Sequence, residues 1–378
     1  MQVDSDNYRA VYLHVPFCRH RCGYCDFTLL AGRDRLIDDF LKAIAIEFSS
    51  INEKLQLDTL FFGGGTPSHF TSAQLERLFE IVFEKVELTE GAEFSVEVNP
   101  SDITPKKVET FVNAGANRFS LGVQSFDAEI LQTLERDHRF AEIERALETV
   151  RQRCKNISID LIFAAPGQSK ALWERTLEQA VGFAPTHLST YCLTIEKGSA
   201  FFSRQRRGEL LVPDEESQRT MYEHTMQFLP QHRYQQYEIS NFAQPGFACR
   251  HNDAYWSGKP YLAFGPGASG FDGTNRWTND RSVRRWMTKL LSGQSGVAER
   301  DKITPDERAR EMLAIGLRRN NGVNLGEFES RWGMSAMTLA GVAIDRLISN
   351  GLIEKTAQSI RLTAKGRLFA DSIATEIV

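Results

Sequence analysis

The sequence predicts an α/β protein built around a parallel sheet, followed by a small C-terminal domain. Short β-rich runs alternate with longer amphipathic stretches over the first half of the chain, which is typical of strand–helix–strand units with right-handed crossovers. Six such units are too few to close an ordinary eight-stranded barrel, and periodicity alone does not separate a partial barrel from a doubly wound sheet. The 378 residues allow one large domain and one small one.

Each unit is expected from its own run of residues. The expected strands are residues 10–15, 59–62, 93–98, 118–122, 157–163 and 187–193. The expected helices between them are residues 33–55, 72–85, 104–114, 140–153 and 170–182. In the first helix, Leu36, Phe40 and Leu41 follow the helical spacing of apolar residues. Thr71 stands directly before the second helical pattern, where a polar side chain can cap a helix.

The second half of the chain has a different pattern. Residues 199–208 are basic and indicate a loop, whereas residues 213–229 predict a further helix. The weak periodicity of residues 231–300 indicates a loop-rich cover over a site. From residue 304 onward, helical patterns followed by a short hairpin predict a winged-helix-like α+β domain. The expected regions are therefore the α/β unit (1–230), a connecting and cover region (231–303) and a C-terminal domain (304–378).

Composition and charge exclude several classes of protein. A formal charge of −4, with 42% hydrophobic and 25% charged residues, describes an ordinary globular protein with a sizeable core. No nucleic-acid partner is expected, because such proteins carry a basic face. Residues 1–6 lack the basic start and apolar core of a signal peptide, and no uncharged run approaches the length of a membrane span. Cytoplasm is the expected location, and the scattered Cys154, Cys192 and Cys249 do not indicate a disulfide framework.

Three cysteines lie close together directly after the first expected strand. Cys18, Cys22 and Cys25 belong to a chain with six cysteines in total. Cysteine thiolates are the usual ligands of iron–sulfur clusters, and three of them would leave one iron of a 4Fe–4S cluster open. Two alternatives are a structural zinc site completed by His20 and a buried helix face. The charged residues between the cysteines disfavour burial, and His20 lies where a short chain closes a tetrahedron poorly.

Other residues suited to chemistry follow the expected strands at the same end. In parallel α/β folds, functional groups gather at the carboxyl ends of the strands. The glycine-rich residues 63–67 follow the second strand, Glu97 ends the third, and Asp160 lies in the fifth. Glycines let a ligand approach the main chain closely, although the same residues also suit a tight turn. A carboxylate such as Glu97 can accept hydrogen bonds from both hydroxyls of a ribose.

These motifs resemble those of the radical SAM family. The Cys-x3-Cys-x2-Cys spacing is that of the family, and the phrase from Tyr12 to Phe27 is similar to the branch of oxygen-independent coproporphyrinogen III oxidases and HemW-type haem chaperones. The resemblance implies a partial, six-unit TIM-type barrel that is open on one side. It also implies a 4Fe–4S cluster on the three cysteines, with S-adenosylmethionine on the fourth iron. The oxidases of this branch carry a fourth cysteine where this chain has Phe27, which favours the chaperones.

The resemblance also implies roles for individual residues around the cofactor. Gly64, Gly65 and Thr66 match the segment that holds the methionyl amino group of S-adenosylmethionine. Tyr24 matches an aromatic residue that stacks on adenine, and Tyr12 is placed to contact the sulfonium. Four further residues match positions that contact the sugar or the carboxylate of the cofactor: Glu97, Gln124, Arg136 and Asp160. Each of these residues could equally be an ordinary surface or capping residue.

A second motif, Cys-Arg-His-Asn-Asp-Ala-Tyr-Trp, lies at residues 249–256 in the expected cover region. Histidine and aromatic rings suit a planar, apolar ligand with a metal centre. The alternative is a plug for the open barrel, with His251 hydrogen-bonded in the core. The His-Asn-x-x-Tyr-Trp pattern matches the motif associated with haem binding in HemW-type proteins. The resemblance therefore makes His251 the candidate axial ligand of haem, and Cys249 a weaker one.

The function that the resemblance implies is that of a haem chaperone. Such a protein binds haem as cargo and transfers it to apo-haemoproteins, so no catalytic residue is assigned. The alternative is an enzyme of porphyrin biosynthesis that resembles oxygen-independent coproporphyrinogen III oxidase. A homodimer and a transient membrane association without a transmembrane segment are left open.

Overall fold

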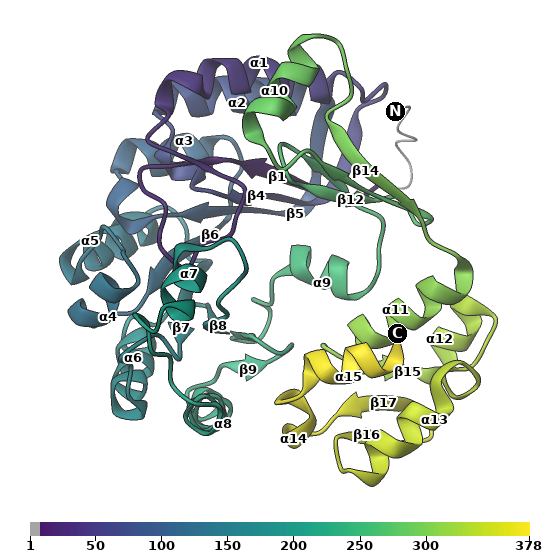
Figure 1. Cartoon of the computed structure of the whole chain (residues 1–378). Coiled ribbons are helices and arrows are strands. Elements are labelled where there is room, and N and C mark those ends of the chain that lie inside the picture. The colour runs from purple at the N-terminus through teal and green to yellow at the C-terminus, as the bar shows by residue number, and fades with distance from the viewer. Residues whose placement is uncertain (1–7) are drawn as a thin grey trace.

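The computed structural model describes residues 8–378, so the N-terminal segment on which the signal-peptide expectation rests lies outside the described residues. Within residues 8–378, the main sheet has nine strands in the order β11-β1-β4-β5-β6-β7-β8-β10-β9 (Figure 1). Six of them run parallel and in chain order, which confirms the predicted six-unit α/β partial barrel. These are β1 (Ala10–Val15), β4 (Leu55–Gly64), β5 (Val86–Val98), β6 (Arg118–Gln124), β7 (Ile157–Phe163) and β8 (His187–Cys192).

Amphipathic helices connect the parallel strands, and α2 shows why they form. Thr71 closes a capping box with Gln74 at the start of α2, and Leu75, Leu78 and Val82 recur on its buried face. The helices of this part are α1 (Ile37–Phe48), α2 (Ser72–Lys85), α3 (Pro105–Asn113), α4 (Ala128–Thr133), α5 (Phe140–Arg151) and α6 (Lys170–Gly182). Short elements between them are β2 (Phe17–Cys18), β3 (Leu30–Ala31), η2 (Asp34–Leu36), η3 (Pro67–His69) and η4 (Pro100–Asp102).

The structure differs from the predicted elements in several places. The helix expected over residues 33–55 ends at Phe48, because Leu55 already opens β4. The basic residues 199–208, expected as a loop, form α7 (Ala200–Arg206). Ser199 caps α7 by accepting a hydrogen bond from the backbone N–H of Phe202. A helix of 7 residues is too short to show a clear periodicity in the sequence.

The section expected to be loop-rich contributes strands to the sheet instead. β11 (Leu262–Phe264) pairs in parallel with β1, and β10 (Asn241–Ala243) pairs antiparallel with β8. Each has 3 residues, too few for a visible alternation. The other elements from residue 213 to 302 are α8 (Glu215–Gln231), β9 (Gln235–Gln236), α9 (Arg250–Trp256), β12 (Ser269–Phe271), β13 (Asn275–Asn279), α10 (Val283–Leu291) and β14 (Val297–Lys302). Strands β12, β13 and β14 form a separate small sheet.

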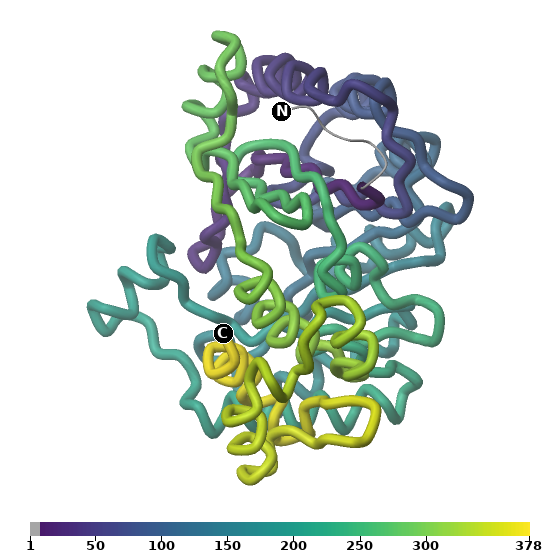
Figure 2. Tube along the Cα trace, turned by 90° about the vertical axis from the view of Figure 1, so that its right-hand side faces the viewer, coloured from purple at the N-terminus to yellow at the C-terminus, as the bar shows by residue number. Residues whose placement is uncertain are grey.

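The C-terminal domain combines helices and a hairpin, as the sequence predicts. It lies below the barrel next to α9 (Figures 1 and 2) and has a hydrophobic core of its own. Its elements are α11 (Pro305–Gly316), β15 (Val323–Asn324), α12 (Leu325–Trp332), α13 (Ala336–Ser349), β16 (Ile353–Lys355), β17 (Ser359–Leu362), α14 (Ala364–Arg367) and α15 (Ala370–Ile377). The domain limits at residues 230 and 303 stay a prediction. In the described part of the chain, every helix is too short or too polar to span a bilayer.

Candidate functional site

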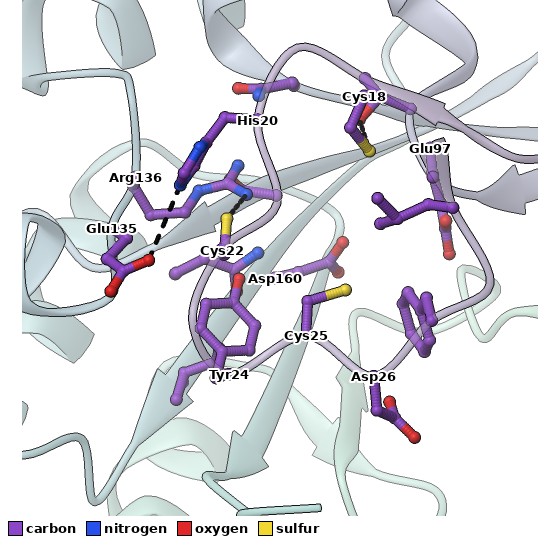
Figure 3. A pocket seen from close by; sticks show the side chains of 18 of the residues that line it. Cys18, His20, Cys22, Tyr24, Cys25, Asp26, Glu97, Glu135, Arg136 and Asp160 are labelled. Atoms are coloured by element: carbon purple, nitrogen blue, oxygen red, sulfur yellow. Dashed lines mark hydrogen bonds and ion pairs between the residues drawn. The ribbon is translucent and has the colours of Figure 1, made fainter. Parts of the chain in front are cut away.

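A cavity of about 450 Å³ lies at the carboxyl edge of the parallel strands. Figure 3 shows the side chains of Cys18, Cys22 and Cys25 around this cavity, together with Glu97 and Asp160. The strands reach this edge because consecutive units place their loops on the same side of the sheet. Eight of the residues predicted to contact the cofactor line this cavity: Tyr24, Gly64, Gly65, Thr66, Glu97, Gln124, Arg136 and Asp160. The structure therefore brings most of the predicted residues together.

The cysteine loop is irregular and is held by its own backbone and by Arg21. The N–H of Cys25 donates to the carbonyl of Cys22 at 3.1 Å, which closes a tight turn. The Arg21 guanidinium donates to three carbonyl groups of the following segment, those of Cys25, Phe27 and Leu29, each at 3.1 Å. These hydrogen bonds hold the loop in one conformation although it has no regular secondary structure.

The thiols of the loop have few partners inside the protein. Cys18 Sγ lies 3.2 Å from Thr66 Oγ1, and Arg136 Nη1 donates to Cys22 Sγ at 3.6 Å. Burial raises the pKa of the Cys18 thiol to about 12 and also raises the pKa of Cys25. A cation bound among these sulfurs would favour their thiolate forms, because positive charge nearby stabilises the ionised group.

The position of His20 bears on the alternative of a single zinc ion. Among residues 8–378, no three His, Cys, Asp or Glu side chains stand close enough together to hold one metal ion. His20 instead faces Glu135, with Nε2 3.7 Å from Oε2, and its side chain is 53% exposed. This geometry disfavours the alternative zinc site. The burial alternative also fails, because the three cysteines line a cavity. Sulfurs spread around a shared cavity suit a 4Fe–4S cluster, whose ligands bind different irons.

The glycine segment is required by the close approach of β1 and β4. Gly64 has φ +100°, and a Cβ there would lie 2.3 Å from the ring of His14. The N–H of Gly64 donates to Glu97 at 2.9 Å, and the N–H groups of Gly65 and Thr66 donate to backbone carbonyls. These N–H groups are engaged within the protein, so the segment can offer its carbonyl oxygens to a ligand that donates hydrogen bonds. An ammonium group is such a donor.

Two carboxylates face the cavity with different surroundings. Glu97 accepts one hydrogen bond, from Gly64, and burial together with the charge of Asp160 raises its pKa to about 7. Asp160 accepts hydrogen bonds from three hydroxyl groups, those of Ser120, Ser158 and Ser189. Glu97 therefore keeps acceptor capacity for a ligand such as a ribose, whereas Asp160 is already well satisfied.

A second chamber, of about 190 Å³, lies deeper in the barrel. It shares four lining residues with the larger cavity: Glu97, Ser120, Asp160 and Tyr191. Its other walls include two residues predicted from the sequence, Tyr12 and His251. The hydroxyl of Tyr12 bonds His14 Nδ1 at 3.0 Å. Tyr12 therefore lies one layer below the cavity that holds the other predicted residues.

His251 lies on the buried side of α9. Figure 1 shows α9 on the open side of the barrel. His251 is 1% exposed, and both ring nitrogens have partners: Nδ1 with Thr59 Oγ1 at 3.0 Å and Nε2 with the Tyr255 hydroxyl at 2.7 Å. Burial lowers the pKa of His251 to about 3, so the ring is neutral. Cys249 is fully buried, with Sγ 3.5 Å from Glu93 Oε1.

Sequence reasoning missed the residues that hold α9 in place. The Glu93 carboxylate accepts hydrogen bonds from the backbone N–H groups of Arg250 at 3.0 Å and His251 at 3.1 Å. Arg118 lines the inner chamber and is 2% exposed. The sequence does contain a pattern that could have pointed to Glu93. Glu93, Ser95 and Glu97 alternate with apolar residues and so share one face of β5. No local signal marks Thr59 or Arg118 as neighbours of the motif.

Comparison with known proteins agrees with this architecture. Residues 12–180 match the profile described as the Radical SAM superfamily, and residues 303–369 match the HemN C-terminal domain. The solved structure of coproporphyrinogen III oxidase (HemN) from Escherichia coli superposes with a TM-score of 0.86 at 23% identity, covering 99% of this chain and 91% of that one. The fold and the three-cysteine cavity thus define a radical SAM protein, a class that uses a 4Fe–4S cluster and S-adenosylmethionine.

Full-length relatives define the subgroup more closely. The chain is 33% identical over 372 residues to "Heme chaperone HemW" of Bacillus subtilis (strain 168), covering 97% of this chain and 98% of the relative. It is 35% identical over 359 residues to the protein of the same name from Lactococcus lactis subsp. lactis (strain IL1403), covering 94% of each. The chain belongs to the HemW family.

Proposed function

We propose that this protein is a haem chaperone that binds haem and transfers it to apo-haemoproteins. The observation that carries the proposal is similarity over nearly the whole chain, at 33% and 35% identity, to proteins named heme chaperone HemW. The cavity and the buried motif helix supply the sites that such an activity needs. Haem is the cargo of the protein, and no residue is assigned a catalytic role.

The cluster belongs on Cys18, Cys22 and Cys25, and S-adenosylmethionine belongs beside it in the same cavity. Together these two groups supply one-electron chemistry when bound. Tyr24 would lie against the adenine, and Glu97 would accept hydrogen bonds from the ribose hydroxyls. The remaining cofactor contacts are assigned to Tyr12, Gly64, Gly65, Thr66, Gln124, Arg136 and Asp160. Support comes from the cavity, which is lined by all of these residues except Tyr12.

His251 is the proposed axial ligand of haem iron. Its neutral ring suits iron, which binds deprotonated imidazole nitrogen. Both nitrogens are engaged, so ligation requires His251 to give up the hydrogen bond with Thr59 or the one with Tyr255. The chamber of about 190 Å³ is also small for a macrocycle, so α9 must shift for haem to reach the ring. Cys249 is a weaker candidate because it does not line this chamber and because burial raises the pKa of its thiol to about 12, which disfavours the thiolate that would bind iron.

An enzyme of the coproporphyrinogen III oxidase type is the second candidate. The shared fold with HemN favours it, but likeness at 23% identity concerns the fold alone. Phe27 stands where the oxidases carry a fourth cysteine; it lines the cavity and is 56% exposed. The apolar ring there offers no ligand or proton donor, so this position weighs against the oxidase.

Haem and recipient apo-haemoproteins are the proposed partners, and cytoplasm is the proposed location. A homodimer and a transient contact with a membrane surface are further proposals.

A turnover assay separates the two candidates. The cluster is reconstituted anaerobically, and the protein receives S-adenosylmethionine, a reductant and coproporphyrinogen III. We expect stoichiometric haem binding by the same preparation and no protoporphyrinogen. More than one equivalent of protoporphyrinogen would make this protein an oxidase and overturn the chaperone proposal.

A further inference from the structure

The middle of the cysteine loop is covered by a segment from a distant part of the chain. After β8, the chain turns back and forms α7 (Ala200–Arg206), which Figure 1 shows beside the segment that follows β1. The backbone N–H of Phe201 donates to the carbonyl of Gly23 at 2.8 Å. Gly23 lies between Cys22 and Cys25, so α7 touches the loop directly between two of the proposed cluster ligands.

The Phe201 ring fills the space next to Gly23 completely. The ring is 0% exposed, and a Cβ added at Gly23 would lie 2.4 Å from it. The same ring packs edge-on against Tyr24, with 6.2 Å between the ring centroids. Phe201 belongs to a small hydrophobic cluster, separate from the main core, whose other buried members are Ile130, Leu134, Ile162, Ala165 and Leu210. The loop is thus packed on one side against a rigid apolar support.

Charged groups also connect α7 and the cysteine loop to the segment between α4 and α5. Glu135 lies between the helices α4 and α5, and its carboxylate accepts a hydrogen bond from Arg204 of α7 at 3.2 Å. The other carboxylate oxygen lies 3.7 Å from Nε2 of His20 in the cysteine loop. The next residue, Arg136, donates to Cys22 Sγ. Because these pairs are partly exposed, each contributes little on its own, and the buried ring carries most of the support.

We propose that Phe201 is a positioning residue for the cluster. By fixing the backbone of Gly23 and the ring of Tyr24, it fixes where Cys22 and Cys25 place their sulfurs and where the aromatic face meets the cofactor. Neighbours that orient metal ligands are known to change metal affinity about 10–100-fold when altered. This inference rests on the cluster assignment of the proposed function and not on the assignment of haem.

The first test compares Phe201→Ala with Leu210→Ala in the reconstituted full-length protein. Both substitutions remove a buried apolar side chain from the same small cluster, but Phe201 also packs against Gly23 and Tyr24 of the loop. We expect Phe201→Ala to lose its cluster to a chelator about ten-fold faster than wild type, and Leu210→Ala to lose it at nearly the wild-type rate. The measurements are iron and sulfide content over time and the melting temperature of the cluster-free proteins.

A spectroscopic readout separates positioning from loss of stability. In Phe201→Ala, we expect weaker binding of S-adenosylmethionine and an altered electron paramagnetic resonance signal of the reduced cluster with this cofactor. Leu210→Ala should keep the wild-type signal. Equal rates of cluster loss and equal spectra in the two variants would overturn the proposal. A wild-type protein that assembles no 4Fe–4S cluster would instead refute the cluster assignment itself.

A double-mutant cycle tests the contact directly. Gly23→Ala should push against the Phe201 ring and impair cluster assembly, because a Cβ has no room there. Glu135 Oε1 would also lie 2.9 Å from this Cβ, but it ends a flexible side chain that can move. In the Phe201→Ala background the added methyl group gains room, so Gly23→Ala should then have little further effect. Additive effects of the two substitutions would contradict the proposed contact.

Discussion

The cysteine loop and α9 both carry proposed metal ligands, but they present them in opposite ways. Cys18, Cys22 and Cys25 line an open cavity, and their sulfurs have few partners inside the protein. His251 is enclosed, and both of its ring nitrogens are hydrogen-bonded. The proposed cluster site therefore needs few existing contacts to break, whereas the proposed haem site requires His251 to lose a hydrogen bond. We expect haem to bind more slowly than the cluster cofactor for this reason.

Cys22→Ala tests the proposed cluster site and should have the largest effect. Two thiolates cannot hold a 4Fe–4S cluster firmly, so the brown absorbance and the bound iron should be lost. The cluster-free protein should keep its melting temperature within a few degrees, because the Cys22 side chain lines a cavity. Cys154→Ala is the matched control, since that thiol lies outside both cavities. A full cluster in the Cys22 variant would reject the ligand set.

His251→Ala tests the enclosed site. The variant should lose the Soret band of bound haem and keep the cluster, because His251 does not line the cavity of the cysteines. Loss of the ring also removes two buried hydrogen bonds, which should lower the free energy of unfolding by about 2–4 kcal/mol. Titration with haem and urea unfolding measure the two effects. Haem affinity equal to wild type would remove His251 as the ligand.

The pH dependence of S-adenosylmethionine binding tests the role of Glu97. Its pKa is raised to about 7 by burial and by Asp160, while Arg118 acts in the opposite direction. The carboxylate accepts ribose hydrogen bonds best when ionised, so affinity should fall as the pH drops through 7. Glu97→Gln should bind about 10-fold more weakly at pH 8 and show a flatter profile, because hydrogen bonds to charged groups are the stronger ones. Calorimetric titrations at pH 6, 7 and 8 provide the measurement, and an unchanged slope would count against Glu97.

Tyr255→Phe should leave a ring nitrogen of His251 without its partner, so that the proposed haem site becomes more similar to the cavity of the cysteines. This substitution has the smallest expected effect. It frees Nε2 of His251 from its hydroxyl partner without creating a large cavity. The free energy of unfolding should fall by about 1 kcal/mol, and haem should bind faster by a few-fold. Stopped-flow mixing with haem measures the rate. Slower binding would mean that Tyr255 assists the ligand instead of blocking it.

The sequence predicts the parallel strands and the cysteine loop because their signals are local. Ala10–Val15 and Ile157–Phe163 appear as compact apolar runs, and Cys18, Cys22 and Cys25 are close in the chain. The residues that surround His251 could not be found in this way. Thr59 and Glu93 are brought to it by pairing across the sheet, over separations of 192 and 158 residues. Short elements such as β11 and α7 also lack enough residues for a periodic pattern.

The position of β1 between β4 and β11 determines when the barrel can be completed during protein synthesis. A ribosome makes the chain from its N-terminus, so the cysteine loop emerges long before Phe201 and the strand at Leu262–Phe264. Pairing between such distant segments is slow, because a long loop must close before the contacts form. Until then, one edge of β1 and one side of the cysteine loop are uncovered. Cluster insertion is therefore expected only after the chain has been synthesised past Phe264.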